Sequence, residues 1–285
     1  MLIRPGHNAI EALVRMALDE DAPWGDVTSQ TWIAGSMRVT AQLVARESGV
    51  LSGEDVFTAA MSLTDPAIRT QFVVHDAETF AGLTVLATIE GPARGVLQAE
   101  RVALNFVQRM SGIATLTAQY VAAVAGTKAR IVDTRKTTPG LRLVERYAVR
   151  CGGGHNHRYS LSDAVMVKDN HLAMLSGAHN VAEALQTMRG RLPHTTHVEV
   201  EADRPEQIEA ILAGGADTIL LDNFTTAQLT AAVAQIAGRA LVEASGGITR
   251  DRIHEVAKTG VDIISVGALT HSARSLDLGL DILPQ

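Results

Sequence analysis

The pattern that most constrains the fold begins after Gly126, where short apolar stretches alternate with segments of helical spacing. Each stretch stops at a polar residue or a glycine, and the six clearest read ARIVDTRK, DAVMVKDN, HVEVEAD, DTILLDN, ALVEASGG and DIISVGAL. Five of the residues at which they stop are Lys168, Glu201, Asp222, Ser245 and Gly267. These residues are 33, 21, 23 and 22 positions apart, a spacing typical of strand–helix units with short loops. The alternation predicts an α/β fold with a parallel sheet, arranged as an incomplete (β/α) barrel.

The first part of the chain has a different pattern. Apolar residues have helical spacing over residues 10–18, and a second helical run begins at Leu97. Between them, β-rich stretches separated by Gly, Pro and Asp occupy residues 37–46, 69–76 and 83–91. We therefore predict an N-terminal α+β domain over residues 1–112 and a barrel domain over residues 113–271. The C-terminal tail, about residues 272–285, is expected to pack on the first domain.

Positive charge is concentrated in one part of the chain. The formal net charge is -6, yet residues 128–171 contain nine Lys or Arg against four acidic residues, a local net charge of +5. Aromatic residues, which nucleic-acid binders use for stacking, make up only 4% of the chain. The pattern argues against a nucleic-acid partner and favours a small anionic ligand.

The cysteine content and the absence of long apolar runs indicate the cellular compartment in which the protein is expected. Cys151 is the single cysteine, which excludes an internal disulfide framework and any multi-cysteine metal site. The opening MLIRPGHNAI lacks the apolar core of a signal peptide, and no stretch approaches the roughly 20 apolar residues of a spanning helix. We expect a soluble cytoplasmic protein without a membrane partner, in which Cys151 has a structural role.

In a parallel barrel the C-terminal ends of all strands meet at one edge, so residues that end different strands converge there. The predicted members of this strand-end cluster are Asp133 to Lys136, Lys168, Glu201, Asp222, Ser245 to Gly247 and Gly267. Its cations would repel one another, since unit charges 4 Å apart interact by roughly 4 kcal/mol at an effective dielectric near 20. The cluster therefore requires an anionic ligand. Because lysine is a point charge and arginine a planar fork, a ligand with both phosphate and carboxylate groups fits it best.

Two late loops predict a phosphate site. The segments SGGITRDRI and SVGALTHS each place glycine after a strand and before a helix. In barrels the last two loops commonly hold a phosphate on backbone N–H groups and a helix N-terminus. A plain turn explains either loop alone, but the occurrence of glycine in both favours phosphate binding.

Two carboxylates predict a metal ion. Glu201 and Asp222 are the acidic strand ends in the middle of the barrel, and Glu199 shares its parity with Glu201. One or both of these glutamates therefore face the barrel axis. Carboxylates beside a phosphorylated ligand indicate Mg²⁺, which binds one or two carboxylates together with phosphate oxygens. Ion pairing with Lys136 or Lys168 is the alternative role for the same carboxylates.

The residues alone leave two other chemistries open. Lys168 at a strand end has the position of a Schiff-base lysine in a barrel lyase or aldolase. His155 and His157 have the spacing of paired metal ligands in barrel hydrolases, although they follow a glycine run rather than lying in a strand. The chain contains neither GxxxxGK[ST] nor GxGxxG, which argues against a phosphate loop or a dinucleotide fold.

Longer motifs carry a family resemblance. In order, they are DTRKTTPGLR, ERYAVRCGGGHNHR, VKDNH, VEVEAD, ILLDN, EASGG and SVGALTHS, with GDVTS and AERVALNFVQRMSGIAT before them. In these motifs the chain resembles nicotinate-nucleotide pyrophosphorylase (carboxylating), also called quinolinate phosphoribosyltransferase, over nearly its whole length. The resemblance implies an N-terminal open α/β sandwich domain and an incomplete α/β barrel. A related molybdenum-locus protein shares this fold and is a second candidate, but it differs in the VKDNH and GGGxNHR motifs.

The resemblance also implies a reaction. The family transfers phosphoribosyl from phosphoribosyl pyrophosphate to quinolinate, which is pyridine-2,3-dicarboxylate, in the biosynthesis of NAD. Decarboxylation accompanies the transfer, so the products are nicotinate mononucleotide, CO₂ and pyrophosphate. Mg²⁺ accompanies phosphoribosyl pyrophosphate, and no organic cofactor is expected. The implied assembly is a homodimer or a larger homo-oligomer with shared active sites.

The resemblance assigns roles residue by residue. For quinolinate it implies Thr134, Arg135, His157, Arg158 and Lys168, with Arg101 supplied by a neighbouring subunit. For phosphoribosyl pyrophosphate and Mg²⁺ it implies Lys136, Glu201 and Asp222. For the 5′-phosphate it implies Ser245, Gly246, Gly247, Val266, Gly267, Ala268 and His271. The implied catalytic residues are Lys136, Lys168, Glu201 and Asp222.

Overall fold

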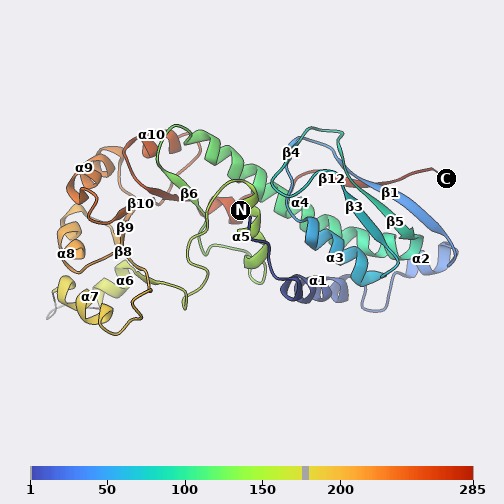
Figure 1. The fold of residues 1–285 in the computed structure, drawn as a ribbon, viewed down its shortest axis with the longest axis horizontal. Helices are drawn as coiled ribbons and strands as arrows, with labels where there is room; N and C mark the ends of the chain where they lie inside the picture. Colours follow the sequence, from blue (N-terminus) through green and yellow to red (C-terminus); the bar gives the residue numbers. More distant parts are fainter. Residues whose placement is uncertain (1, 175–179, 285) are drawn as a thin grey trace. The chain divides into compact units, whose positions relative to one another are not determined.

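The structure is a computed structural model that describes residues 2–174 and 180–284 (Figure 1). Residues 1 and 285, which end the predicted domain ranges, and residues 175–179 of the predicted barrel domain lie outside the described residues. The chain forms two compact units. The first unit comprises Met1–Ala118, Lys136–Gly153 and Ala268–Gln285, and the second comprises Gln119–Arg135 and Gly154–Gly267.

The sheet of the first unit contains, among the described residues, four strands in the order β12-β1-β5-β3, each antiparallel to its neighbours. These strands are β1 (Arg38–Ala45), β3 (Arg69–Phe72), β5 (Val85–Pro92) and β12 (Leu278–Ile282). A short pair, β2 (Gly49–Val50) and β4 (Thr79–Phe80), lies outside this sheet. In β1 the side chains of Ala41, Leu43 and Ala45 are fully buried and Gln42 is not, as expected when one face of an antiparallel sheet covers a core.

Helices complete the first unit. They are α1 (His7–Asp21), α2 (Val27–Trp32), α3 (Glu54–Thr64), α4 (Ala93–Ala123), α5 (Arg142–Cys151) and α11 (Ala268–His271). Helix α1 packs on α3 and buries Ile10 and Val14, which lie four residues apart on one helical face. Helix α2 begins at Asp26, whose carboxylate accepts hydrogen bonds from two backbone N–H groups of its first turn.

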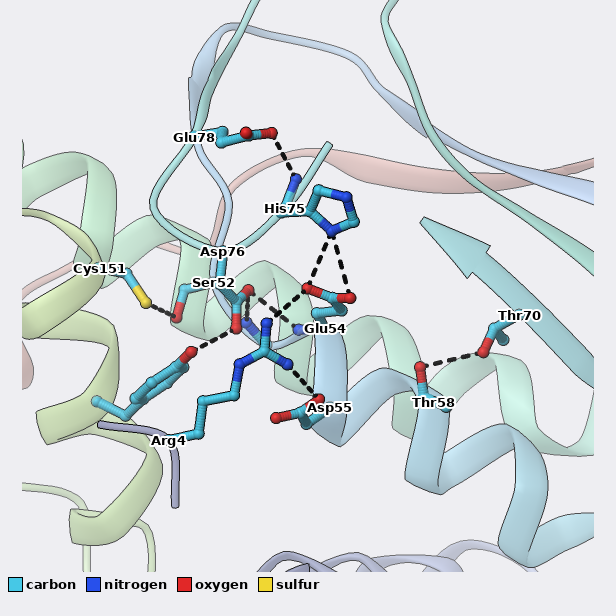
Figure 2. A network of polar contacts seen from close by, with 12 residues as sticks. Arg4, Ser52, Glu54, Asp55, Thr58, Thr70, His75, Asp76, Glu78 and Cys151 are labelled. Carbon is cyan, nitrogen blue, oxygen red and sulfur yellow. Dashed lines mark hydrogen bonds and ion pairs between the residues drawn. The ribbon is translucent and has the colours of Figure 1, made fainter. Parts of the chain in front are cut away.

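A partly buried carboxylate joins α3 to α5 inside the first unit (Figure 2). Asp76 Oδ1 accepts hydrogen bonds from the backbone N–H groups of Gly53 at 2.8 Å and Glu54 at 3.1 Å, where α3 begins. Its Oδ2 accepts a third from the hydroxyl of Tyr147 in α5, at 2.8 Å. Burial raises the pKa of Asp76 and is the largest influence on it. Asp76 therefore satisfies orphan donors at a helix N-terminus that lies inside the protein.

Two further contacts extend this network. Arg4 pairs with Asp55 Oδ1 at 2.7 Å, which fixes the N-terminal segment against α3. Ser52 Oγ donates a hydrogen bond to Cys151 Sγ at 3.3 Å, as Figure 2 shows. Burial raises the pKa of the Cys151 thiol to about 12, so the thiolate is disfavoured. This environment agrees with the structural role expected for Cys151.

The second unit is built on a parallel sheet. Its described strands are β6 (Arg130–Val132), β7 (Val165–Val167), β8 (Val198–Ala202), β9 (Thr218–Asp222), β10 (Leu241–Ser245) and β11 (Ile263–Ser265). The order across the sheet is β6-β11-β10-β9-β8-β7, and every pairing is parallel. All five residues of β8 are buried, as expected for a strand covered on both faces.

Helices follow the strands of this sheet. They are α6 (Asp169–Ala173), α7 (Val181–Arg189), the 3₁₀ turn η1 (Pro205–Gln207), α8 (Ile208–Ala213), α9 (Thr226–Ile236) and α10 (Ile253–Lys258). The unusual Pro205 lies at the first position of η1, where a missing N–H costs no hydrogen bond. In the part of the chain that the structure describes, no helix has both the length and the apolar character needed to cross a membrane.

The sheet is not closed into a barrel. β6 and β7 are consecutive strands in the sequence, but among the described residues they form its two opposite edges. A single parallel bridge, Val132 to His155, adds the segment after α5 to the free edge of β6. The prediction of an incomplete α/β barrel, preceded by an N-terminal α/β domain with its own sheet, is confirmed. The six strands after Gly126 fall where the sequence pattern placed them.

Candidate active site

The C-terminal ends of neighbouring strands bring the acidic and basic side chains of the second unit together. The parallel register pairs Val167 of β7 with Val200 of β8, so the next residues, Lys168 and Glu201, are neighbours. Lys168 Nζ lies 3.0 Å from Glu201 Oε2 and donates a hydrogen bond to it. The Lys168 side chain keeps 48% of its surface exposed, whereas that of Glu201 keeps 10%. A buried carboxylate thus holds an accessible ammonium at the edge of the sheet.

Asp222 and Ser245 extend this edge. They pair in register at the ends of β9 and β10. Glu201 pairs with Leu220, and Asp222 lies two residues beyond Leu220, so the two carboxylates project from the same face of adjacent strands. Asp222 Oδ2 accepts a hydrogen bond from Asn223 Nδ2 at 2.7 Å. Glu201 and Asp222 therefore offer oxygen ligands on one face, which is the donor chemistry that Mg²⁺ requires.

Beneath this edge lies a second charged group, formed by His157, Glu199 and Glu243. His157 Nε2 is 3.1 Å from Glu199 Oε2 and 3.5 Å from Glu243 Oε1, and both carboxylates are buried. Burial by itself would lower the pKa of the imidazole, but the hydrogen bonds and charges of the two carboxylates raise it to about 10. Burial is also the main cause that raises the pKa of Glu199. We call these three residues the inner triad.

The inner triad holds one proton more than the same groups would hold in water at neutral pH. The backbone N–H of Arg158 donates to His157 Nδ1 at 2.7 Å, so Nδ1 carries no proton in this arrangement and Nε2 carries one. A neutral imidazole beside one protonated carboxyl has the same net charge as an imidazolium beside two carboxylates. Both forms leave the triad with a net charge of -1, which offsets the cations above it.

The inner triad is also a group of possible metal ligands. Within the described residues, the ligand atoms of His157, Glu199 and Glu243 lie within 4.8 Å of one another. The imidazole already bonds through both ring nitrogens, however, and the contacts to the two carboxylates are those of an ion pair. His155, the other half of the predicted histidine pair, is not part of this group. The arrangement does not favour the metallohydrolase hypothesis.

Asp133 fixes the glycine-rich segment beside β6. Its buried carboxylate accepts hydrogen bonds from the backbone N–H of His157 at 2.7 Å and from Asn156 Nδ2 at 2.6 Å. Two backbone hydrogen bonds, His155 N–H to Ile131 O at 2.8 Å and Asp133 N–H to His155 O at 3.1 Å, continue the sheet into this segment. The segment therefore acts as a short extra strand beside β6, and its His157 side chain reaches the carboxylates of β8 and β10.

Arg158 has a second cation, Arg135, in its electrostatic surroundings. Burial and the nearby charge of Arg135, in that order, lower the pKa of the Arg158 guanidinium. Arg158 Nη1 donates a hydrogen bond to the backbone carbonyl of Ala164 at 3.0 Å, which orients the side chain. Two guanidinium groups close enough to oppose one another are an arrangement that an anion stabilises.

The late glycine loop has the backbone geometry that requires glycine. Gly246 and Gly247 have φ values of 87° and 57° in the left-handed region. A Cβ on Gly246 would lie 2.2 Å from Asn223 Oδ1 and 2.9 Å from the Asn223 backbone nitrogen. Asn223 N–H in turn donates to Ser245 O at 3.0 Å. The loop after β10 is thus packed against the loop after β9, beside Asp222.

The predicted site residues divide between the two units. The second unit contains Thr134, Arg135, His157, Arg158, Lys168, Glu201, Asp222, Ser245, Gly246, Gly247, Val266 and Gly267. The first unit contains Arg101, Lys136, Ala268 and His271. Arg101 lies on α4, and the side chains of Arg101, Lys136 and His271 are exposed. Inside the first unit, Thr270 Oγ1 donates to the backbone carbonyl of Lys136 at 2.8 Å, which joins α11 to the segment that carries Lys136.

Sequence reasoning did not identify Glu243 or the anchoring role of Asp133. Glu243 shares its parity with Ser245 and interrupts the apolar stretch ALVEAS, so an inward-facing acid was a readable signal. Its contact with His157, which is distant in the sequence, follows only from the order of strands in the sheet. Asp133 was included in the strand-end cluster, but its hydrogen bonds turn it inward as a support for the segment that carries His157.

Comparison with family models assigns nearly the whole chain. Residues 26–111 match the quinolinate phosphoribosyl transferase N-terminal domain, and residues 113–281 match the C-terminal domain of the same family. These two matches cover far more than half of the chain.

Individual relatives agree with the family models. Nicotinate-nucleotide pyrophosphorylase (carboxylating) of Mycobacterium leprae is 44% identical over 284 residues, which cover 96% of this chain and 98% of that protein. The chloroplastic enzyme of the same name from Arabidopsis thaliana is 38% identical, with 96% and 82% covered. The solved structure of nicotinate-nucleotide pyrophosphorylase from Francisella tularensis superposes with a TM-score of 0.92 at 36% identity and covers 99% of both chains.

Proposed function

Because the chain belongs to the quinolinate phosphoribosyltransferase family, we propose a division of roles among its strand-end residues. The activity of the protein is that of a carboxylating nicotinate-nucleotide pyrophosphorylase. It transfers phosphoribosyl from phosphoribosyl pyrophosphate to quinolinate with decarboxylation, and it yields nicotinate mononucleotide, CO₂ and pyrophosphate. This assignment is favoured over a Schiff-base lyase using Lys168 and over the related molybdenum-locus protein.

The quinolinate side of the site consists of cations. Its proposed members are Thr134, Arg135, His157, Arg158 and Lys168. The effect of the Arg135 charge on the pKa of Arg158 supports this role, because a dicarboxylate would offset both positive charges and could accept bidentate hydrogen bonds. For His157 we propose a positioning role and no direct contact with the substrate, since both of its ring nitrogens bond to groups of the protein. His157 would fix the backbone of Arg158 while Arg158 meets the carboxylate.

The phosphoribosyl pyrophosphate side consists of carboxylates, Lys136 and glycine loops. Glu201 and Asp222 project from one face of adjacent strands, and each uses one oxygen in a hydrogen bond with the protein. These oxygens fit Mg²⁺, which would neutralise the charge of the pyrophosphate when it is bound. We assign the 5′-phosphate to the backbone of the two late loops, formed by Ser245 to Gly247 and Val266 to Ala268, and to His271.

The proposed residues act on charge and position. As pyrophosphate leaves the ribose C1 through an oxocarbenium-like state, Lys136 stabilises the developing negative charge. Arg135 and Arg158 orient the ring so that the pyridine nitrogen faces C1. In enzymes generally, positioning of the reactants can lower the activation free energy by up to ~7–11 kcal/mol. Once the nitrogen is bonded to C1, its positive charge stabilises the electron pair that stays on ring C2 when the 2-carboxylate departs as CO₂. A proton then bonds to C2 and completes the product. No organic cofactor is required for this step.

A shared site between subunits is the proposed role of Arg101. The residue is exposed on α4. The first unit also exposes Trp24 and Trp32, at 90% and 85%, an apolar surface that a second copy would cover. We propose a homodimer in which Arg101 completes the quinolinate site of the neighbouring copy.

We also propose a cellular location and a domain division for the chain. Cys151 is buried with a pKa raised to about 12 by that burial, which suits a reducing, cytoplasmic location. The two family models meet between residues 111 and 113, which supports domains over residues 1–112 and 113–271. The pairing of β12 with β1 supports packing of the tail, about residues 272–285, on the first domain.

The observation that carries the proposal is the meeting of Lys168 and Glu201, 3.0 Å apart, at the ends of adjacent parallel strands. Purified protein with quinolinate, phosphoribosyl pyrophosphate and Mg²⁺ should form nicotinate mononucleotide and release CO₂. Omission of Mg²⁺ in the presence of a chelator should abolish the product. Folded protein that forms no product with all three present would contradict the proposed function.

Mixed refolding tests the shared site. Arg101→Ala and Lys168→Ala should each be nearly inactive alone. Refolded together with random pairing, half of the dimers are mixed, and each mixed dimer has one intact site, so about a quarter of all sites should recover. Verified mixed dimers without activity would place Arg101 outside the neighbour's site.

A further inference from the structure

A second buried ion pair lies in the first unit, formed by Arg109 of α4 and Glu145 of α5. Arg109 Nη2 is 2.9 Å from Glu145 Oε1, and Nε is 3.2 Å from the same oxygen. The Glu145 side chain is fully buried, with 0% of its surface exposed. Replacing a buried ion pair with apolar side chains is often neutral or stabilising, so stability alone is a weak explanation for this pair.

Glu145 holds the segment that leads from Lys136 to α5. Its Oε1 accepts a hydrogen bond from Thr138 Oγ1 at 2.8 Å, and its Oε2 accepts one from the Thr138 backbone N–H at 3.1 Å. Thr138 lies two residues after Lys136. The carboxylate therefore fixes the backbone on one side of Lys136.

Arg109 holds the end of α11 and the residues that follow it. Its Nη2 donates a hydrogen bond to the backbone carbonyl of Thr270, and its Nη1 donates to that of Ala273 at 2.7 Å. These carbonyls lie at and beyond the C-terminal end of a helix, where acceptors have no helical partner. Gly112, one turn further along α4, lets the Arg274 backbone approach so closely that a Cβ there would lie 1.9 Å from Arg274 O. The segment is thus clamped to α4.

Thr270 closes the network. It is fully buried, and its Oγ1 donates to the backbone carbonyl of Lys136 at 2.8 Å. The neighbouring residue is His271, for which the proposed role is 5′-phosphate binding, whereas Lys136 is proposed to bind the pyrophosphate. The two side chains proposed for opposite ends of one substrate are therefore joined through Thr270, Arg109 and Glu145.

We propose that Arg109, Glu145 and Thr270 are positioning residues that hold the backbone segments of Lys136 and His271 in one fixed arrangement, in which the two side chains bind phosphoribosyl pyrophosphate. The inference rests on the proposed roles of Lys136 and His271. Because these three residues fix the segments that carry Lys136 and His271 before the substrate arrives, binding does not have to pay for ordering those segments. They therefore act on the affinity for phosphoribosyl pyrophosphate. Quinolinate binding does not depend on these segments.

The central test compares Thr270→Val with Thr270→Ser. Valine keeps the shape of threonine but removes the donor to Lys136 O, whereas serine retains the hydroxyl. Thr270→Val should raise KM for phosphoribosyl pyrophosphate about 5- to 20-fold, since one lost hydrogen bond to a buried carbonyl is worth roughly 1–2 kcal/mol. Thr270→Ser should stay within about twofold of the unaltered protein, and the Kd for quinolinate should not change in either variant.

A matched control comes from the same helix. Arg94 also donates from α4 to backbone carbonyls, at 2.9 Å from Nε and 2.7 Å from Nη2 to Ile33 O. Arg94→Met and the double variant Arg109→Met with Glu145→Met each remove an arginine anchor. Only the double variant should raise KM for phosphoribosyl pyrophosphate, by about tenfold or more, even if both variants lower the melting temperature.

The outcomes separate this inference from the proposed function. If the unaltered protein forms nicotinate mononucleotide but Thr270→Val and the double variant keep its KM for phosphoribosyl pyrophosphate, the positioning role is overturned. Equal increases in KM for both substrates, or the same increase in Arg94→Met, would also overturn it, because they indicate general loosening of the fold. An unaltered protein that forms no product contradicts the proposed function instead.

Discussion

The inner triad of the second unit buries two carboxylates, and the Asp76 network of the first unit contains a partly buried one, but the two networks complete their hydrogen bonds differently. Asp76 accepts three hydrogen bonds from its own chain, from Gly53, Glu54 and Tyr147 (Figure 2). In the inner triad, Glu199 Oε2 and Glu243 Oε1 both contact His157 Nε2, at 3.1 and 3.5 Å, and Glu199 Oε1 is buried without a hydrogen-bond partner among the described residues. Both oxygens of Asp76 accept hydrogen bonds, whereas the carboxylates of the inner triad do not have all of their acceptors satisfied by the described residues.

This difference distinguishes a charged group that stabilises the fold from one that acts in the proposed site. Asp76 accepts hydrogen bonds from backbone N–H groups that would otherwise lack a partner at a helix N-terminus, so its hydrogen bonds are complete in the folded chain. The inner triad lies under strand ends that carry Lys168 and Arg158, and its uncompensated negative charge is complementary to those cations. Removing a strand-end side chain should therefore lower the activity, whereas removing the Asp76 side chain should lower the free energy of unfolding.

The largest expected effect is at Lys168. Lys168→Ala should lower kcat/KM by about 10³-fold, because it removes a cation at the reacting end of the sheet, where such groups are worth ~3–4 kcal/mol. Its melting temperature should stay close to that of the unaltered protein, since the side chain is 48% exposed. Steady-state kinetics and thermal unfolding on the same samples check both statements.

The matched control is Lys128, which pairs with Asp262 Oδ1 at 2.7 Å and is 60% exposed. It belongs to the same unit but lies before β6 instead of after a strand. Lys128→Ala should keep full activity. Equal losses in the two variants would mean that position at a strand end does not distinguish the site.

Asp76 should show the opposite behaviour. Asp76→Ala leaves the N–H groups of Gly53 and Glu54 and the Tyr147 hydroxyl without their acceptor, which should lower the free energy of unfolding by about 2–4 kcal/mol. Urea unfolding measures this loss, and kcat per folded molecule at low temperature should be unchanged. A stable variant with reduced kcat would place the Asp76 network in the catalytic machinery.

Tyr147→Phe is a milder probe of the same network. It keeps the ring, which is buried, and removes one of the three hydrogen bonds to Asp76. We expect a loss of about 1 kcal/mol in the free energy of unfolding. The double variant with Asp76→Ala should lose less than the sum of the two single losses, because both changes remove the same hydrogen bond.

The smallest expected effect is a pH dependence from the inner triad. The folded pKa of His157, about 10, lies above its ordinary value, so its stabilising contribution is complete below about pH 6.5. That contribution should decline as the pH rises from about 6.5 towards 10. Glu243→Gln removes one of the carboxylates that raise this pKa, so its unfolding free energy should decline less steeply over the same range. Parallel pH profiles for the two proteins would contradict the assignment.

Strand pattern explains why so much of the second unit could be predicted from the sequence. Apolar runs such as DTILLDN begin and end within a few residues of the observed strands, and their polar last residues mark the functional edge. The ion pair of Lys168 with Glu201 follows from this pattern, since both residues end adjacent strands. Local sequence was sufficient here because a parallel strand buried on both faces has a strong apolar signature.

Other elements depend on distant contacts that local sequence does not encode. Strand β12 is a short run, LGLDI, whose extended form depends on its antiparallel pairing with β1 near the other end of the chain. Helix α5 follows the first apolar stretch, as the alternation predicts, but its packing in the first unit through Tyr147 and Asp76 depends on residues far apart in the sequence. The link from Arg109 through Thr270 to Lys136 joins three separate segments, so spacing along the chain gives no signal for it.

Binding of quinolinate to Arg158→Ala tests the central claim, that the strand-end cations bind the dicarboxylate, most directly. Isothermal titration of quinolinate into this variant should give a Kd about 10- to 100-fold weaker than that of the unaltered protein, because a charge-assisted hydrogen bond contributes roughly 1.5–3 kcal/mol. Arg130→Ala, at the opposite end of β6, should bind quinolinate normally. An unchanged Kd in folded Arg158→Ala would contradict the account.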